Sequence, residues 1–102
     1  IAETNNPSLL LPRVDDIDAH VFHIFPLMCA ERDRLQQHLA ALDIQTQIHY
    51  PLPPHKQQCY PECNNLSFPV AEKLSACELS LPLHPLLTDE EVDEIIRGCL
   101  NF

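Results

Sequence analysis

The hydrophobic positions of the chain change period along its length and so predict where strands and helices lie. Residues 9–12 form a short apolar run, and residues 20–27 are apolar on both alternating faces. We interpret them as two strands, the second of them central in a sheet. Residues 45–50 alternate weakly, which predicts a short edge strand. Residues 79–83 follow as one more extended segment.

Three other segments, residues 30–42, 67–77 and 88–102, have the period of an amphipathic helix. The second of them opens with a proline in its first turn, a position that suits proline because the first helical amide has no partner. The third has the cleanest pattern of the chain. The expected inner stripes are Leu35, Leu39 and Leu42 in the first helix, Val70, Leu74 and Cys77 in the second, and Val92, Ile95, Ile96, Cys99 and Leu100 in the third.

Two helix ends are marked by particular residues. Thr88 and Glu91 fit a capping box, in which the threonine hydroxyl accepts from the third helical amide and the glutamate reaches back to the amide of Thr88. The first helix should end at Asp43, where a left-handed residue is usual and aspartate tolerates that conformation better than most. The order of elements predicts an α/β (α+β) fold, a small three- to four-stranded, mainly antiparallel sheet with helices packed on it.

The length of 102 residues suits one small domain. Residues 1–8 are polar and predict a linker remnant, so the domain proper covers residues 9–102. The only methionine is Met28, and we therefore expect the chain to be a piece of a longer protein. No apolar run approaches the roughly 18 residues that a membrane helix needs, so no membrane is expected as a partner.

The net charge and the cysteines indicate which partners and which cellular location to expect. Six lysines and arginines against 15 aspartates and glutamates give a net charge of -9, which would repel nucleic acid or an anionic membrane. Of the five cysteines, Cys29, Cys77 and Cys99 lie within apolar sequence, as small core residues do. We interpret all five as reduced thiols, which predicts a cytoplasmic location.

The segment of residues 51–65 contains four prolines, so neither a helix nor a central strand can run through it. Loops of this length in small domains are usually functional. At its start, His49, Tyr50 and His55 place two imidazoles and a phenol on a stiff backbone. This combination suits hydrogen bonding to a polar ligand with little loss of conformational entropy.

A zinc site at this loop has weaker support. His49, His55, Cys59 and Cys63 could supply two nitrogens and two sulfurs to a tetrahedral zinc. Structural zinc sites, however, usually begin with paired cysteines on rigid hairpins or helix ends, whereas here the histidines come first.

A self-sufficient catalytic site is also poorly supported. A single glycine excludes a glycine-rich phosphate loop. The two lysines, Lys56 and Lys73, lack the apolar surroundings that Schiff-base chemistry needs. His20 and His23 flank Phe22 on the predicted central strand, and a structural role is favoured for both.

Four motifs in a fixed order nevertheless resemble the end of a known enzyme family, the DegT/StrS sugar aminotransferases. The resemblance covers nearly all of this chain and about the last quarter of such an enzyme. The motifs are His49-Tyr50-Pro51 with Pro53 and His55, Phe68-Pro69-Val70-Ala71-Glu72, Ser80-Leu81-Pro82-Leu83-His84-Pro85, and Thr88-Asp89-Glu90-Glu91-Val92.

The resemblance implies a fold-type I enzyme that uses pyridoxal phosphate (PLP) to move an amino group, usually from glutamate, onto a nucleotide-linked keto sugar in polysaccharide biosynthesis. This chain would be its small C-terminal domain, with a large PLP domain of the same chain and a second subunit, in a homodimer, as partners. The family's Schiff-base lysine belongs to the large domain, so the chain alone is expected to be inactive, with no catalytic residue, cofactor or metal. The family commonly has glycine where this chain has Asp43.

On this interpretation His49, Tyr50 and His55 are the candidate substrate-binding residues, and the substrate is a nucleotide sugar. Two alternatives remain open at this point. One is a stand-alone acidic interaction module that uses the proline-rich loop of residues 51–65 as its contact surface. The other is the zinc-binding loop.

Overall fold

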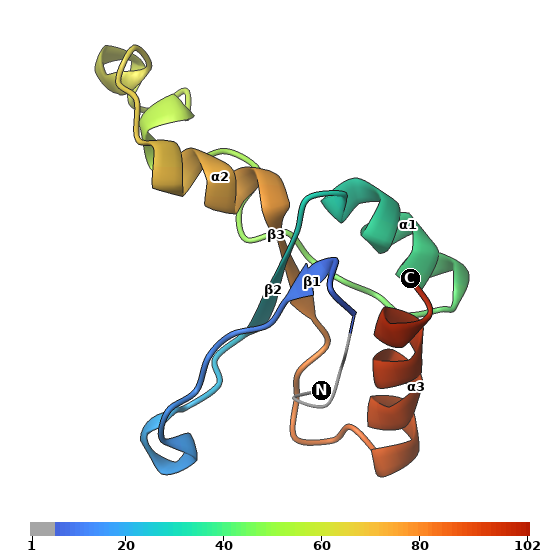
Figure 1. Cartoon of the computed structure of the whole chain (residues 1–102). Coiled ribbons are helices and arrows are strands. Elements are labelled where there is room, and N and C mark those ends of the chain that lie inside the picture. Colours follow the sequence, from blue (N-terminus) through green and yellow to red (C-terminus); the bar gives the residue numbers. More distant parts are fainter. Residues whose placement is uncertain (1–5) are drawn as a thin grey trace.

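The computed structural model describes residues 6–102, and the first five residues of the predicted linker lie outside it. Three antiparallel strands form one small sheet in the order β1-β2-β3 (Figure 1). They are β1 (Leu9–Leu10), β2 (Phe25–Cys29) and β3 (Glu78–Leu81). The small mixed fold with a mainly antiparallel sheet is therefore confirmed, and β2 is its central strand.

Three α-helices surround this sheet: α1 (Arg32–Ala41), α2 (Pro69–Cys77) and α3 (Asp89–Leu100). α1 packs against α3 and against both longer strands, whereas α2 contacts β2. Figure 1 shows α2 and the loop before it projecting from the body that the sheet, α1 and α3 form. The capping box predicted at the start of α3 is present in full. Among the described residues, none of these helices is long and apolar enough to cross a membrane.

The hydrophobic core lies where α1 and α3 meet the sheet. Leu35 and Leu39 of α1 are fully buried there, and Ile95 and Cys99 of α3 are nearly so. Burying a leucine side chain contributes about 1.5–3 kcal/mol, so these few residues supply much of the fold's stability. The other buried members are Leu9, Leu27, Cys29, Ile44, Leu79 and Leu81.

The single glycine explains how closely α3 approaches the end of α1. A Cβ atom at Gly98 would lie 3.0 Å from Cδ2 of Leu39 and 3.1 Å from Cδ1 of Ile44. Both distances are shorter than ordinary carbon contacts of about 3.5–4.0 Å. The limited space at this position, and not backbone freedom, therefore favours glycine and disfavours a larger side chain.

The end of α1 confirms one prediction and corrects another. Asp43 has a φ of 62°, the left-handed conformation expected after the helix. Leu42 was predicted to belong to the inner stripe, but its side chain is 50% exposed. The helix ends at Ala41, so the turn at Leu42 and Asp43 no longer follows the helical period, and Ile44 fills the core position instead.

The predicted strand over residues 20–27 is wrong in its first half. The strand begins only at Phe25, and Phe22 has a φ of 48°, which no extended strand allows. The amide of Phe22 donates to Nδ1 of His20, forming a local turn. None of residues 20–24 is buried, and Val21 is 91% exposed. His20 and His23 therefore do not lie on a strand.

Two further predictions needed correction. Residues 45–50 do not form a full edge strand but make a single antiparallel bridge between Gln47 and Ser80. The expected inner stripe of α2 is not buried, since Val70 is 74% and Leu74 48% exposed, and the residue of α2 that is buried is Ser75. The pattern marks an apolar face correctly but gives no information on which face meets the sheet.

The proline-rich loop is ordered by its own hydrogen bonds. As predicted, neither an α-helix nor a strand runs through residues 51–65, although two short 3-10 turns do, Pro54–Lys56 and Pro61–Cys63. The side-chain amide of Asn64 donates to the carbonyls of His55, Gln57 and Tyr60 and so links both turns. None of the five cysteines forms a disulfide within the described part of the chain.

Candidate functional site

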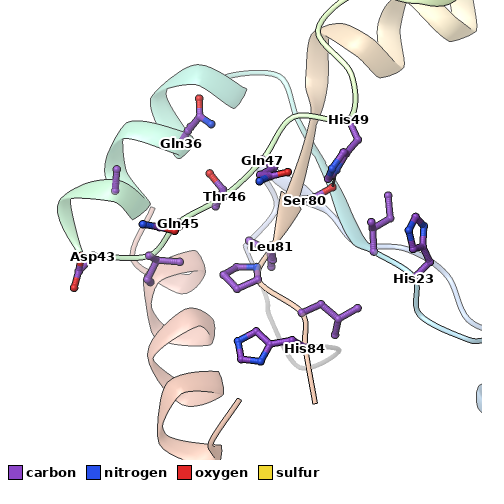
Figure 2. Close-up of a pocket in the computed structure, with 15 residues that line it drawn as sticks. His23, Gln36, Asp43, Gln45, Thr46, Gln47, His49, Ser80, Leu81 and His84 are labelled. Carbon is purple, nitrogen blue, oxygen red and sulfur yellow. Dashed lines mark hydrogen bonds between the residues drawn. The ribbon is translucent and has the colours of Figure 1, made fainter. Parts of the chain in front are cut away.

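An open pocket of about 820 Å³ lies between the chain that leaves α1 and the end of β3 (Figure 2). One wall consists of residues 43–49 and the other of residues 80–84, with residues 23 and 24 closing one end. The polar side chains of the lining are His23, Gln36, Asp43, Gln45, Thr46, Gln47, His49, Ser80 and His84.

The bridge between Gln47 and Ser80 positions the first wall against the second. The amide of Ser80 donates to the Gln47 carbonyl at 2.7 Å, and the amide of Gln47 donates back at 3.1 Å. Because side chains alternate along a strand, Glu78 and Ser80 lie on one face of β3. That face is the one that His49 approaches.

His49 is held by both of these side chains. Its backbone amide donates to Oε2 of Glu78 at 2.7 Å, and Nδ1 of its ring lies 2.8 Å from Oγ of Ser80. The Ser80 hydroxyl in turn donates to Oε1 of Glu78. Glu78 and Ser80 are buried, whereas His49 is half-buried and lines the pocket. These hydrogen bonds among His49, Ser80 and Glu78 form a relay that fixes the imidazole at the pocket wall. Nε2 of His49 takes no part in this relay.

The other two predicted site residues have different surroundings. Tyr50 contacts the His49 ring edge-on at a centroid distance of 5.3 Å, but it is exposed and does not line the pocket. His55 lies on the projecting loop and is buried there, edge-on against Phe68. Its Nε2 has no hydrogen-bond partner and lies 3.7 Å from Oε1 of Glu72. The structure thus brings His49 and Tyr50 together and keeps His55 apart.

The four residues of the zinc hypothesis do not converge. Within residues 6–102, no group of three or more His, Cys, Asp or Glu side chains is arranged to hold a metal ion. His49 is engaged with Ser80, and Cys59 is exposed with its Sγ 3.8 Å from Oε1 of Gln57. No metal chemistry is therefore assigned to the loop.

The pocket on this chain does not fit PLP without further protein. PLP requires a lysine amine for its aldehyde and donors or positive charge for its phosphate. The described lining of the pocket includes neither lysine nor arginine. Nζ of Lys56 donates to the Asn64 carbonyl at 2.8 Å and lies 3.9 Å from Glu72, and Lys73 is exposed on α2.

Sequence reasoning missed Glu78 as a part of the site. Ser80 was noticed only as a member of a motif, and Glu78 not at all. The available signal was an acidic residue at the start of the apolar run Glu78-Leu79-Ser80-Leu81, because a carboxylate in a buried strand must find hydrogen-bond donors. His84 was likewise known only from its motif, although it lines the same pocket.

The chain is thus a small mixed domain with a half-buried histidine at the wall of an open pocket whose lining holds one acidic residue, Asp43, and no lysine or arginine. The DegT/DnrJ/EryC1/StrS aminotransferase family matches residues 3–99. The chain belongs to this family. The resemblance predicted from the four motifs is thereby confirmed.

A curated relative and two solved structures show what the chain is similar to. The dTDP-3-amino-3,6-dideoxy-alpha-D-galactopyranose transaminase of Aneurinibacillus thermoaerophilus is 45% identical over 95% of this chain and 27% of its own length. The crystal structure of S. venezuelae DesV in complex with a ketimine intermediate has a TM-score of 0.85 at 32% identity, over 93% of this chain and 26% of that one. NtdA from Bacillus subtilis, solved with bound cofactor PMP, has a TM-score of 0.80 at 28% identity, over 93% and 23%.

The chain spans only about a quarter of the length of the curated relatives it matches. Several of the matched proteins are named as transaminases or aminotransferases of nucleotide-linked sugars, and this region is about a quarter of each of these proteins.

Proposed function

We propose that the chain is the C-terminal domain of a PLP-dependent aminotransferase that transfers an amino group from glutamate to a nucleotide-linked keto sugar. The observation that carries the proposal is the position of His49, held by Glu78 and Ser80 at the wall of an open pocket. The relatives support it, because the similar proteins transaminate dTDP-linked sugars. A large domain of the same chain would bind PLP, which supplies the electron sink for amino transfer.

His49 is the residue of this domain that we assign to substrate binding. The backbone around it is fixed by the Gln47 bridge on one side and by prolines on the other, so little freedom is lost on binding. Tyr50 packs against its ring and can limit access of water to one side of it. A role for His55 at the substrate rests on the sequence alone and stays a prediction.

The charge of the domain determines which part of the substrate it can bind. A net charge of -9 disfavours a diphosphate, and the described pocket lining provides no cation to offset it. The domain therefore contributes neutral hydrogen bonds, and the large domain supplies positive charge for the phosphates. A homodimer in the cytoplasm remains part of this proposal.

The proposal is tested by the reading frame upstream of the Ile1 codon and by its product. We expect the frame to continue through a large PLP domain, and the purified product to convert a dTDP-linked keto sugar with glutamate into an amino sugar, detected by mass spectrometry. An upstream stop codon close to Ile1, with a folded 102-residue product, would favour the stand-alone interaction module. A full-length protein that binds PLP but aminates no nucleotide sugar would reject the substrate class.

A further inference from the structure

We infer that Glu78 and Ser80 are positioning residues that select the tautomer of His49, so that its Nε2 accepts a hydrogen bond from a sugar hydroxyl in the pocket. The assignment of the tautomer depends only on the hydrogen bonds of this chain. The assignment of the ligand group also rests on the proposed function, because it takes a nucleotide sugar as the substrate.

The first step is a count of protons along the relay. A serine hydroxyl has one proton to donate, and Ser80 donates it to Oε1 of Glu78. Its contact with Nδ1 of His49 at 2.8 Å can then be a hydrogen bond only if Nδ1 carries the proton. A neutral imidazole has one N–H, so Nε2 of His49 is left as an acceptor.

The second step concerns the direction of these hydrogen bonds. Both donors, the His49 amide and the Ser80 hydroxyl, donate to the Glu78 carboxylate, which therefore acts only as an acceptor. Oε2 takes the backbone amide of His49 and Oε1 takes the Ser80 hydroxyl. The nearby guanidinium of Arg32 does not compete, since its Nη1 donates to the carbonyls of Ser75 and Glu78 and its Nε to Asp33. In the described part of the chain, no cation forms an ion pair with the Glu78 carboxylate.

The third step is a comparison with His84, which lines the same pocket (Figure 2). The amide of Leu86 donates to Nδ1 of His84 at 3.2 Å. An accepting Nδ1 requires that the neutral ring carries its proton on Nε2. The pocket therefore presents an imidazole acceptor at His49 and an imidazole donor at His84, two rings of the same residue type with opposite tautomers.

The two tautomers together indicate the ligand chemistry. A sugar hydroxyl can donate to one acceptor and accept from one donor, so a hexose with neighbouring hydroxyls satisfies both rings. A fully ionised phosphate has no proton to donate and would leave Nε2 of His49 without a partner. His49 is thus assigned to the sugar portion of the substrate and not to its diphosphate.

The tautomers can be measured on the 102-residue chain by long-range ¹H–¹⁵N correlation of labelled histidines at about pH 8, where imidazole is ordinarily neutral. We expect a protonated Nδ1 for His49 and a protonated Nε2 for His84. Glu78→Gln should reverse the relay, because the new amide can donate to Ser80, whose hydroxyl then donates to Nδ1 of His49.

The controls make this measurement decisive. Glu72→Gln changes an acid outside the pocket to its amide and should leave the tautomers of His49 and His84 unchanged. Glu78→Gln should likewise leave the tautomer of His84 unchanged. The wild-type spectrum alone decides the assignment if Glu78→Gln fails to fold. The proposal would be overturned if the proton of the His49 ring were found on Nε2 in the wild type. It would also be overturned if that proton stayed on Nδ1 in a folded Glu78→Gln variant.

The ligand group is tested by titrating the full-length enzyme, labelled at its histidines, with dTDP-α-D-glucose and, separately, with dTDP. We expect the Nε2 resonance of His49 to move with the sugar nucleotide only, and affinity to fall about fivefold in Glu78→Gln as one neutral hydrogen bond is lost. Equal shifts with both probes would overturn the sugar assignment. No shift with either would reject His49 as a substrate residue, while the tautomers stand or fall by the first measurement.

Discussion

Burial divides the cysteine side chains into reactive and protected ones. Cys29 and Cys99 are 3% and 1% exposed in the core, whereas Cys59 is exposed on the proline-rich loop. Burial raises the pKa of the Cys99 thiol. The sequence predicted the burial of Cys29 and Cys99 correctly, whereas Cys77, which was placed with them, is only half-buried.

Thiol labelling should follow this order. Since the thiolate is the nucleophile, iodoacetamide at about pH 8 should modify Cys59 first and reach Cys29 and Cys99 only on unfolding. Mass spectrometry of digested, labelled protein checks the order, and rapid modification of Cys99 in the native chain would contradict it.

The raised pKa of the Cys99 thiol also predicts how stability depends on pH. Above about pH 8.5 the unfolded chain ionises this thiol while the folded chain still keeps it protonated. The free energy of unfolding should therefore be lower at about pH 10 than at pH 8.

The backbone at Asp43 gives a second prediction at the residue scale. Its left-handed φ of 62° costs about 1 kcal/mol for a residue with a Cβ and more for a branched one. Asp43→Gly should therefore keep or raise the free energy of unfolding by up to about 1 kcal/mol, and Asp43→Val should lower it by about 1–2 kcal/mol. Urea denaturation measures both, and equal midpoints for the two variants would show that the turn carries no such strain.

At the scale of elements, the sequence predicted a helix or strand best where local hydrogen bonding and burial favour the same structure for the same residues. The capping box of Thr88 and Glu91 uses only neighbouring atoms, and the start of α3 was accordingly predicted well. At the end of α3 the prediction was wrong for Leu100, which was expected on the inner stripe but is 45% exposed. The strand over residues 20–27 and the stripe of α2 failed because an apolar pattern does not reveal which face other elements cover. The relay joins His49 to Glu78 and Ser80, which lie 29 and 31 residues further along the chain, and no local pattern encodes such contacts.

The contact between α1 and α3 can be tested at Gly98. A valine there would push its methyl groups against Leu39 and Ile44 and should cost about 2 kcal/mol or more of unfolding free energy. Gly98→Ala is the matched control. Its overlap with the flexible ends of those two side chains is offset by the better helix propensity of alanine, so a change within about 1 kcal/mol is expected. A Gly98→Val variant as stable as the wild type would mean that the helices are not in close contact.

For the whole molecule, we propose that this domain binds the substrate and that the larger remainder of the enzyme carries the PLP chemistry. Titration of the 102-residue chain with PLP should give no internal aldimine absorbance that survives desalting, because Lys56 is bound to Asn64 and Lys73 lies away from the pocket. A stoichiometric band that is lost on replacing Lys56 or Lys73 would contradict this division of roles.

The family could be predicted from the sequence because four motifs occur in order, whereas the arrangement of the site could not. His49, Tyr50 and His55 are close in the sequence, yet the turn after Pro53 carries His55 to the projecting loop, against Phe68 and away from the pocket. Spacing alone cannot distinguish a histidine at a pocket from one buried within a loop.

The most direct test of the central claim is the steady-state kinetics of the full-length enzyme with His49→Ala. We predict a KM for the nucleotide sugar raised by about 5- to 30-fold, the loss of one hydrogen bond of about 1–2 kcal/mol, with a smaller change in the half-reaction with glutamate. His20→Ala serves as the control, because it removes an exposed imidazole that does not line the pocket. An unchanged KM in His49→Ala, with only stability altered, would contradict the assignment of His49 to the substrate.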